Sequence, residues 1–281
     1  MEVTRHLYGL QAQSPTAPYF ALWARLSGFG AEQLSRLIED RSVVRIVTMR
    51  GTVHAVTAED ALELRPWTQP IMDRDLRTNT QHAKALADLD RQSLESWARA
   101  RLEASPSTLA ALRPALAERW PDRDPASLAH AVRDVLPLVQ VPPRGLWGRS
   151  GQPVCTTLEH WTGSALTEPD PERIVLRYLA AHGPATVADA QAWSGLTRLG
   201  EVFDRLRDRL RIFRRPGRCG ALRSAGRTAA GTRRAGAGPD PRPLRQCAAL
   251  PRGQVASDRR RTPPSPVHRQ RHRQAGAAGG R

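Results

Sequence analysis

The sequence lacks a long apolar run: nowhere do about 18 consecutive apolar residues occur, the length at which a membrane-crossing helix becomes a candidate. The N-terminal stretch MEVTRHLYGL is polar and has no apolar core of the kind found in secretory signals. The three cysteines, at 155, 219 and 247, are far apart and show no C-x-x-C spacing. We therefore expect a cytoplasmic protein with no membrane contact, whose thiols are reduced and bind no structural zinc.

No aromatic residue occurs after Phe213, and acidic residues are rare there. Residues 214–281 carry 17 of the 43 basic side chains but only two of the 27 acidic ones. Most of the formal net charge of +16 therefore comes from this segment, because residues 1–213 hold 26 basic and 25 acidic side chains. The net charge alone does not indicate that the near-neutral body binds nucleic acid.

Residues 214–281 consist mainly of Arg, Ala, Gly and Pro and offer little apolar surface to bury. This composition predicts a disordered, Arg-rich tail. One interpretation is a basic arm that holds nucleic acid. The other, which we favour, is GC-rich DNA translated out of frame, because the composition changes abruptly within a domain, just after the stretch RLRIF begins a strand. We expect that the tail leaves this strand unpaired.

Residues 1–213 repeat one plan three times: two or three amphipathic helices followed by β-branched residues around a turn. This pattern is typical of winged-helix units, so we expect a mainly α fold with short β-hairpins. The first unit includes an inward stripe at Tyr19, Leu22, Trp23 and Leu26 and a hairpin over 43–56 turning at Arg50-Gly51. The expected divisions are 1–92 (first unit and linker), 93–168 (second unit), 169–213 (incomplete third unit) and 214–281 (tail).

Helix starts are marked by capping residues in the second and third units. Asp124-Pro125 and Asp170-Pro171 each combine an N-cap with proline at the first helical position. Thr186 with Asp189 three residues later is a capping-box signal. These pairs predict helices beginning at 125, 171 and 187.

Two glutamines, Gln11 and Gln13, stand in the stretch GLQAQSPTAPYF. Pro15 and Pro18 bias the residues before them toward extended backbone. In an extended segment residues two apart face the same side, whereas on a helix they diverge by about 200°. Both amides could then face one water molecule. Glutamines in such a loop are more often solvated or capping residues, so the spacing alone does not indicate catalysis.

Four stretches together resemble the AlkZ-like winged-helix proteins: GLQAQSPTAPYFALWARL, VRIVTMRGTVHAVTAEDA, VPPRGLWGRSG and HGPATVADAQAWSGL. They occur in the order that the family has, and the resemblance covers residues 1–213 but not the tail. It implies tandem winged-helix units around duplex DNA and a monofunctional glycosylase that excises alkylated purines, including those in interstrand crosslinks. The family's Gln-x-Gln motif would be Gln11 and Gln13, and no cofactor or metal is implied.

The chain departs from the family pattern in two places. Family members usually have a further helix before the stretch at which this sequence starts, and they continue through a completed third wing into a β-rich part. A sister branch of the family carries Asp at the second motif position, so Gln13 aligns this chain with the branch that unhooks crosslinks.

Further residues are candidates for contact with double-stranded DNA. We expect the protein to bind this DNA as a monomer and to be associated with the nucleoid. On the first hairpin these are Arg45, Arg50, Thr52 and His54, and on the second they are Arg144, Trp147 and Arg149. Solvated hairpin charges and an inward-packed Trp147 are the alternatives. The six histidines of the body show no metal spacing, and the other two, His268 and His272, lie in the tail. Two other functions stay open: a winged-helix regulator without catalysis, and a truncated product that folds poorly.

Overall fold

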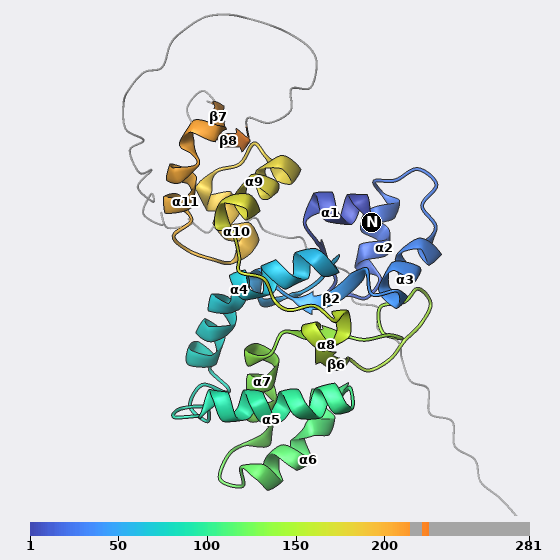
Figure 1. The fold of residues 1–281 in the computed structure, drawn as a ribbon, viewed down its shortest axis with the longest axis vertical. Coiled ribbons are helices and arrows are strands. Elements are labelled where there is room, and N and C mark those ends of the chain that lie inside the picture. Colours follow the sequence, from blue (N-terminus) through green and yellow to red (C-terminus); the bar gives the residue numbers. More distant parts are fainter. Residues whose placement is uncertain (214–220, 225–281) are drawn as a thin grey trace, which may run out of the picture. The chain divides into compact units, whose positions relative to one another are not determined.

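The structure is a computed structural model that describes residues 1–213 and 221–224, all within one compact unit, Met1–Arg233 (Figure 1). Its α-helices are α1 (Glu2–Leu7), α2 (Ala17–Trp23), α3 (Ala31–Glu39), α4 (Ala58–Thr78), α5 (Arg91–Ala104), α6 (Leu109–Arg119), α7 (Pro125–Val135), α8 (Leu158–Thr162), α9 (Pro171–His182), α10 (Val187–Ser194) and α11 (Gly200–Arg205). Its strands are β1 (Leu10–Gln11), β2 (Val43–Val47), β3 (Val53–Thr57), β4 (Ser107–Thr108), β5 (Leu138–Gln140), β6 (Val154–Thr157), β7 (Leu210–Phe213) and β8 (Ala221–Ser224). Short 3-10 helices cover Met49–Gly51 (η1) and Arg207–Arg209 (η2).

The first predicted helix-and-hairpin segment is confirmed by α2, α3, β2 and β3. Tyr19 and Leu22 are buried, as the inward stripe predicts, and the turn between the strands places Arg50 and Gly51 at φ of 56° and 68°. Trp23 differs from the prediction because its side chain is 69% exposed. Trp23 is the last residue of α2, and its side chain does not belong to the buried cluster that holds Tyr19 and Leu22.

The predicted hairpins do not stand alone but join in one six-stranded antiparallel sheet. Its order is β1-β3-β2-β5-β6-β4. Strand β2 of the first segment pairs with β5 of the second through Arg45 opposite Gln140 and Ile46 opposite Val139. The two segments that we expected as separate units, 1–92 and 93–168, therefore share a sheet. Backbone hydrogen bonds between β2 and β5 join one segment to the other.

Helix α4 occupies residues that the sequence had assigned to a linker. It runs for 21 residues despite Pro66 and Pro70 in its interior. Proline has no N–H to donate to the carbonyl four residues earlier. For Pro66 that carbonyl belongs to Leu62, and it accepts instead from Thr167 N at 3.1 Å. A distant segment thus satisfies the acceptor that the first proline leaves open.

The predicted helix starts are confirmed. The Asp124 side chain accepts from the backbone N–H groups of Ala126 and Ser127, and the Asp170 side chain does the same for Glu172 and Arg173. Thr186 and Asp189 form the reciprocal capping box. These caps act within one helical turn, which is why the sequence alone reveals them.

Strands β7 and β8 pair antiparallel, with Leu210 opposite Ser224 and Phe213 opposite Ala221. The expectation that the strand at RLRIF stays unpaired was therefore wrong, since residues 221–224 complete a short hairpin. The predicted disorder of 214–281 concerns residues that lie almost wholly outside the described part of the chain.

Buried side chains form three clusters. One joins the sheet to α4 and to α9–α11, a second lies among α5, α6 and α7, and the third lies between α2, α3 and strands β1–β3. Among the described residues, no helix combines the length and the apolarity that a membrane crossing would require. The third cluster supports the strand that carries the two glutamines.

Candidate active site and nucleic-acid interface

Gln11 and Gln13 lie on an extended segment at the edge of the sheet. Gln11 belongs to β1 and stands opposite His54 on β3. The backbone pairing extends one residue further, because Ala12 N donates to Val53 O at 2.8 Å. Leu10 and Ala12 are buried, whereas Gln11 and Gln13 are exposed. This alternation places both amides on the side opposite the buried pair, as predicted for an extended backbone.

The Gln13 side chain takes the place of a backbone acceptor. Val53 N donates to Gln13 Oε1 at 3.3 Å, while the nearby carbonyl of Ala12 accepts from Arg45 Nη2 at 3.1 Å. The Gln13 amide is therefore held by the edge of β3, and its NH₂ group has no hydrogen-bond partner among the residues that the structure describes.

A cavity of about 300 Å³ lies beside Gln13. Its lining combines amide side chains and one guanidinium with apolar groups: Gln13, Gln140, Gln152 and Arg133, together with Thr108, Leu109, Ile46, Val47, Val53, Leu138, Pro153, Cys155 and Ala110. Gln11 does not line it. The cavity joins Gln13, which follows β1, with residues of the first and second hairpins, so its shape depends on the shared sheet.

Arg45, expected to contact DNA, is instead a structural residue. Its side chain is 1% exposed, and its guanidinium donates to Ala12 O and to Gln140 Oε1, each at 3.1 Å. A Cβ at Gly145 would lie 2.4 Å from Arg45 Cδ, so glycine is required there for close packing. Burial lowers the pKa of Arg45 to about 10, which leaves it charged at neutral pH. Because this side chain cannot reach a phosphate, its predicted role was wrong.

His54 is also inside the protein, with 3% of its surface exposed. Its Nδ1 lies 2.9 Å from Thr52 O. Burial lowers the pKa of His54 to about 4, so the imidazole is neutral at physiological pH. A buried neutral ring offers DNA neither charge nor an accessible donor, and the predicted contact was wrong here too.

The hairpin residues Arg50 and Thr52 lie nearer the surface. Arg50 is exposed, but its Nη1 donates to Trp193 O at 2.7 Å, which ties the hairpin turn to the end of α10. Thr52 is half-buried and its hydroxyl donates to Met49 O at 3.2 Å. Both side chains already have partners, although Arg50 retains further donors toward solvent.

The loop between β5 and β6 carries the other three predicted contacts. Arg149 is exposed, and Arg144 donates from Nη1 to Gly151 O at 2.8 Å. Trp147 is 43% exposed rather than packed inward, with its ring 5.1 Å from Tyr19 and 6.0 Å from Phe20, centroid to centroid.

The sequence did not single out the aromatic surface around Trp147. Phe20 is 60% and Trp23 69% exposed, and together with Trp147 they line a hollow of about 280 Å³. We call the residues of this hollow the aromatic patch: Tyr19, Phe20, Trp23, Phe29, Ala31 and Trp147. Helical spacing alone assigned Trp23 to the core. In the structure this side chain lines the exposed hollow instead.

A sequence model of the family described as DNA glycosylase AlkZ-like matches residues 4–252. The chain belongs to the AlkZ-like DNA glycosylase family. The family match continues past residue 213, so the expectation that the resemblance ends there was wrong. No curated protein matches the chain in sequence.

Among solved structures, the AlkZ-like chain is similar in fold to the DNA glycosylase AlkZ of Streptomyces sahachiroi. The TM-score is 0.64 and the sequence identity 21%. The match covers 79% of the AlkZ-like chain and 63% of the Streptomyces sahachiroi chain. The AlkZ-like chain therefore spans less than two thirds of that relative's length.

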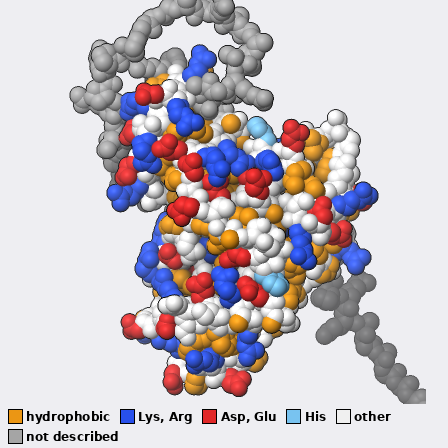
Figure 2. Space-filling view, viewed as in Figure 1, with side chains coloured by type: hydrophobic (Ala, Val, Ile, Leu, Met, Phe, Trp, Pro, Cys, Tyr) orange, Lys and Arg blue, Asp and Glu red, His pale blue; other side chains and the backbone are white. Residues whose placement is uncertain are grey.

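Charge on the AlkZ-like chain is mixed. Figure 2 shows basic and acidic side chains interspersed over the visible face of the described residues, in keeping with their near-neutral total. A broad basic surface is absent from that view. DNA contact by the described residues would therefore depend on particular arginines and aromatic rings.

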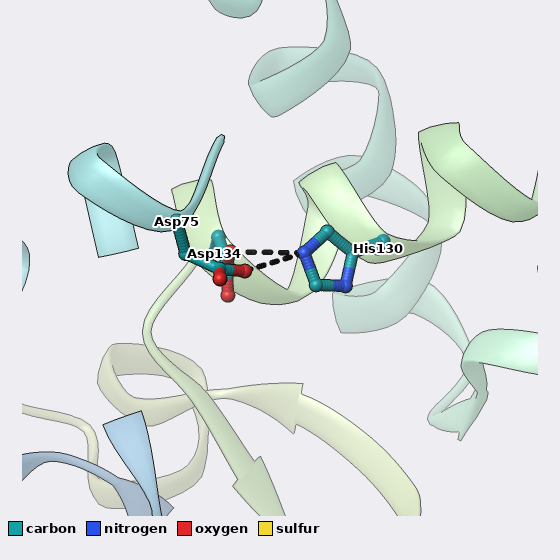
Figure 3. A group of neighbouring side chains, drawn as sticks. All are labelled: Asp75, His130 and Asp134. Atoms are coloured by element: carbon teal, nitrogen blue, oxygen red, sulfur yellow. Dashed lines mark hydrogen bonds and ion pairs between the residues drawn. The ribbon is translucent and has the colours of Figure 1, made fainter. Parts of the chain in front are cut away.

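Among the described residues, one group has the arrangement of metal ligands: Asp75, His130 and Asp134 (Figure 3). One ligand atom from each lies within 4.8 Å of the others. The spacing of histidines alone does not reveal this group, because two of its three members are carboxylates. The available signal was His130 with Asp134 one helical turn later, on the same face of α7.

Proposed function

We propose that the chain is a monofunctional DNA glycosylase that hydrolyses the N-glycosidic bond of alkylated purines, including purines tied into interstrand crosslinks. The observation that carries the proposal is the placement of Gln11 and Gln13. Both amides are exposed on one side of the extended segment formed by β1 and the two residues after it, and Gln13 lines a cavity. Family membership supports the reaction class.

The substrate explains why two neutral amides would suffice. Glycosidases usually need a carboxylic acid to protonate the leaving group. A purine alkylated at N7 is already cationic and leaves as a neutral base, so that proton is unnecessary. What remains is to orient a water molecule toward the oxocarbenium-like sugar, which amide acceptors and donors can do.

The two amides are proposed to have different roles. Gln13 Oε1 already accepts from Val53 N, so the free NH₂ of Gln13 is the end available to a sugar or phosphate oxygen. Gln11 has no side-chain hydrogen bond among the described residues, and its carbonyl is the better acceptor for the attacking water. Gln11 would thus position the nucleophile and Gln13 the sugar–phosphate.

The proposed partner is double-stranded DNA, bound by one copy of the chain through a winged-helix arrangement. Arg149 and Trp147 lie on the loop of the second hairpin, between β5 and β6. Gln152, near the end of the same loop, lines the cavity at Gln13. The aromatic patch and Arg149 together offer stacking surface and a charge beside the proposed catalytic strand. Arg50, Thr52 and Arg144 are proposed as secondary backbone contacts.

The test uses the full chain and an end-labelled duplex with a single N7-methylguanine. Base release leaves an abasic site that heat or alkali converts to a strand break, and a mobility-shift assay on the same duplex measures binding. We expect strand breaks well above those in the same duplex without protein, and none in the unmodified duplex.

The alternatives give different results in the same experiment. Binding of both duplexes without base release would contradict the glycosylase and support a winged-helix regulator. Loss of both release and binding, with a circular dichroism spectrum that lacks helix, would indicate a product that does not fold.

A further inference from the structure

We propose that Asp75, His130 and Asp134 form a binding site for a divalent cation of the zinc class, which fastens α4 to α7. The site is distinct from the two glutamines and independent of the proposed reaction. Figure 3 shows the His130 ring pointing from α7 toward both carboxylates. Asp75 comes from the last turn of α4, so the ion would join two helices that already pack together.

The distances suit one ion. His130 Nε2 lies 3.4 Å from Asp134 Oδ2 and 2.6 Å from Asp75 Oδ2. Zinc with ligands at about 2.1 Å in a tetrahedron separates them by about 3.4 Å. The His130–Asp134 pair already has that separation. Asp75, whose side chain is 38% exposed, is the ligand that would move outward by less than an ångström.

An unsatisfied buried oxygen points to a ligand. Asp134 is 0% exposed and its Oδ2 has no hydrogen-bond partner among the described residues, although it faces His130. Burial of an unpaired carboxylate oxygen is costly. A cation at this point would supply the missing partner.

Surrounding groups orient the three ligands. Asn79 Nδ2 donates to both oxygens of Asp75, at 3.3 and 3.4 Å. The His82 ring stacks on His130 with centroids 4.4 Å apart. Such supporting contacts fix ligand geometry in metal sites.

Nearby arginines do not fill the site. Arg133 Nη1 donates to the other oxygen of Asp134, Oδ1, at 2.8 Å. Arg50 and Arg74 donate to the carbonyls of Trp193 and Gly195. A cavity of about 390 Å³ is lined by Asp75 and His130 and also by these three arginines, and it gives an ion access and leaves room for water to complete its coordination.

Nitrogen and two carboxylate oxygens select the type of ion. Calcium prefers six to eight oxygen ligands, and magnesium keeps most of its water, so neither favours an imidazole. Zinc and cobalt accept this mixed set. Zn²⁺ is therefore the probe for affinity, and Co²⁺ the probe whose visible absorption reports on coordination.

The experiment compares metal uptake by the full chain after chelator treatment. The starting protein carries H268A and H272A, since two histidines four residues apart in the tail could bind zinc themselves. Isothermal titration is expected to give one Zn²⁺ per chain, and zinc at about 100 times Kd should raise Tm by about 5–10 °C. Co²⁺ should give a visible band that zinc removes.

Variants decide between this site and others. Loss of a contact that only supports a ligand typically weakens metal binding by about 10–100-fold. Removal of a ligand itself should weaken zinc binding by more than this in each of the variants H130A, D134N and D75N. D73N removes a carboxylate two residues away on α4 and should leave binding unchanged. D134N should melt in chelator at or above the parent's Tm, because it removes the buried oxygen that lacks a hydrogen-bond partner, while Oδ1 can still accept from Arg133.

Two results would overturn the proposal. One is a starting protein that takes up no zinc. The other is unchanged affinity and Co²⁺ absorption in both D75N and H130A. The Asp75 side chain is partly exposed, so D75N is expected to fold. Its zinc affinity can therefore be measured even if D134N fails to fold.

Discussion

In the proposed reaction Gln13 has two roles. Its Oε1 accepts from Val53 N on β3, and its NH₂, which has no hydrogen-bond partner among the described residues, would contact the substrate. Replacement by Glu keeps the acceptor and removes the donor. Q13E should therefore retain the parent's stability and lose base release. Q13A loses the hydrogen bond as well, and should cost about 1 kcal/mol in the free energy of unfolding. Urea denaturation beside the glycosylase assay separates these effects. A Q13E variant with full activity would contradict the role of the NH₂ group.

His54 provides a prediction about pH. Burial lowers its pKa to about 4, whereas an unfolded chain protonates histidine near 6.5. Between these values the unfolded state binds a proton that the folded state does not. This histidine therefore makes stability fall as pH drops from about 6.5 toward 4, by about 3 kcal/mol.

The measurement is the urea midpoint at pH 7 and at pH 4.5 for wild type and for H54L, with the exposed His160→Gln as control. H54L should lose less stability over that interval than wild type, and H160Q should behave as wild type does. An equal loss in H54L and wild type would show that this ring is not the group responsible.

At the scale of elements, the loop from 141 to 153 depends on close packing at Gly145. That residue has φ of +99°, and an added Cβ would lie 2.4 Å from Arg45 Cδ. G145A should therefore destabilise the protein by about 3 kcal/mol or more, because strain and collision add. Gly148, at φ of +66° with no atom within 4 Å of an added Cβ, is the matched control. G148A should cost only about 1 kcal/mol. Equal losses in urea melts would show that Arg45 does not restrict this loop.

Elements set by local signals could be predicted from the sequence, and those set by distant contacts could not. The caps at Asp124 and Asp170 and the extended stretch before Pro15 depend on near neighbours. Helix α4 was missed because Pro66 indicates a break, and its open acceptor is satisfied by Thr167, about a hundred residues away. The strand pairing of Arg45 with Gln140 is likewise invisible locally.

The same reasoning applies to the candidate sites. Alternation predicted that Gln11 and Gln13 share a side, which needs only their own backbone. Burial of Arg45 and His54 depends on strands and loops packed over them, so hairpin position alone suggested surface contacts that do not exist. Asp75 meets His130 only because α4 packs on α7, and sequence spacing could not show it.

At the scale of the whole molecule, the shared sheet has a consequence for unfolding. Because β2 pairs with β5, residues 1–92 and 93–168 should unfold together, and calorimetry should show one transition for both. A fragment of residues 93–168 leaves the β5 edge unpaired and should not fold by itself. A folded fragment, by circular dichroism and a cooperative melt, would contradict the account and support independent units.

The central claim is that the exposed amides of Gln11 and Gln13 carry out the proposed hydrolysis, and the single-turnover rate of N7-methylguanine release tests it most directly. We expect Q11A and Q13A each to slow release by about 100-fold or more, with duplex affinity within about threefold of wild type, since neither amide is a main contact. Release by the double variant Q11A/Q13A at the wild-type rate would contradict the claim.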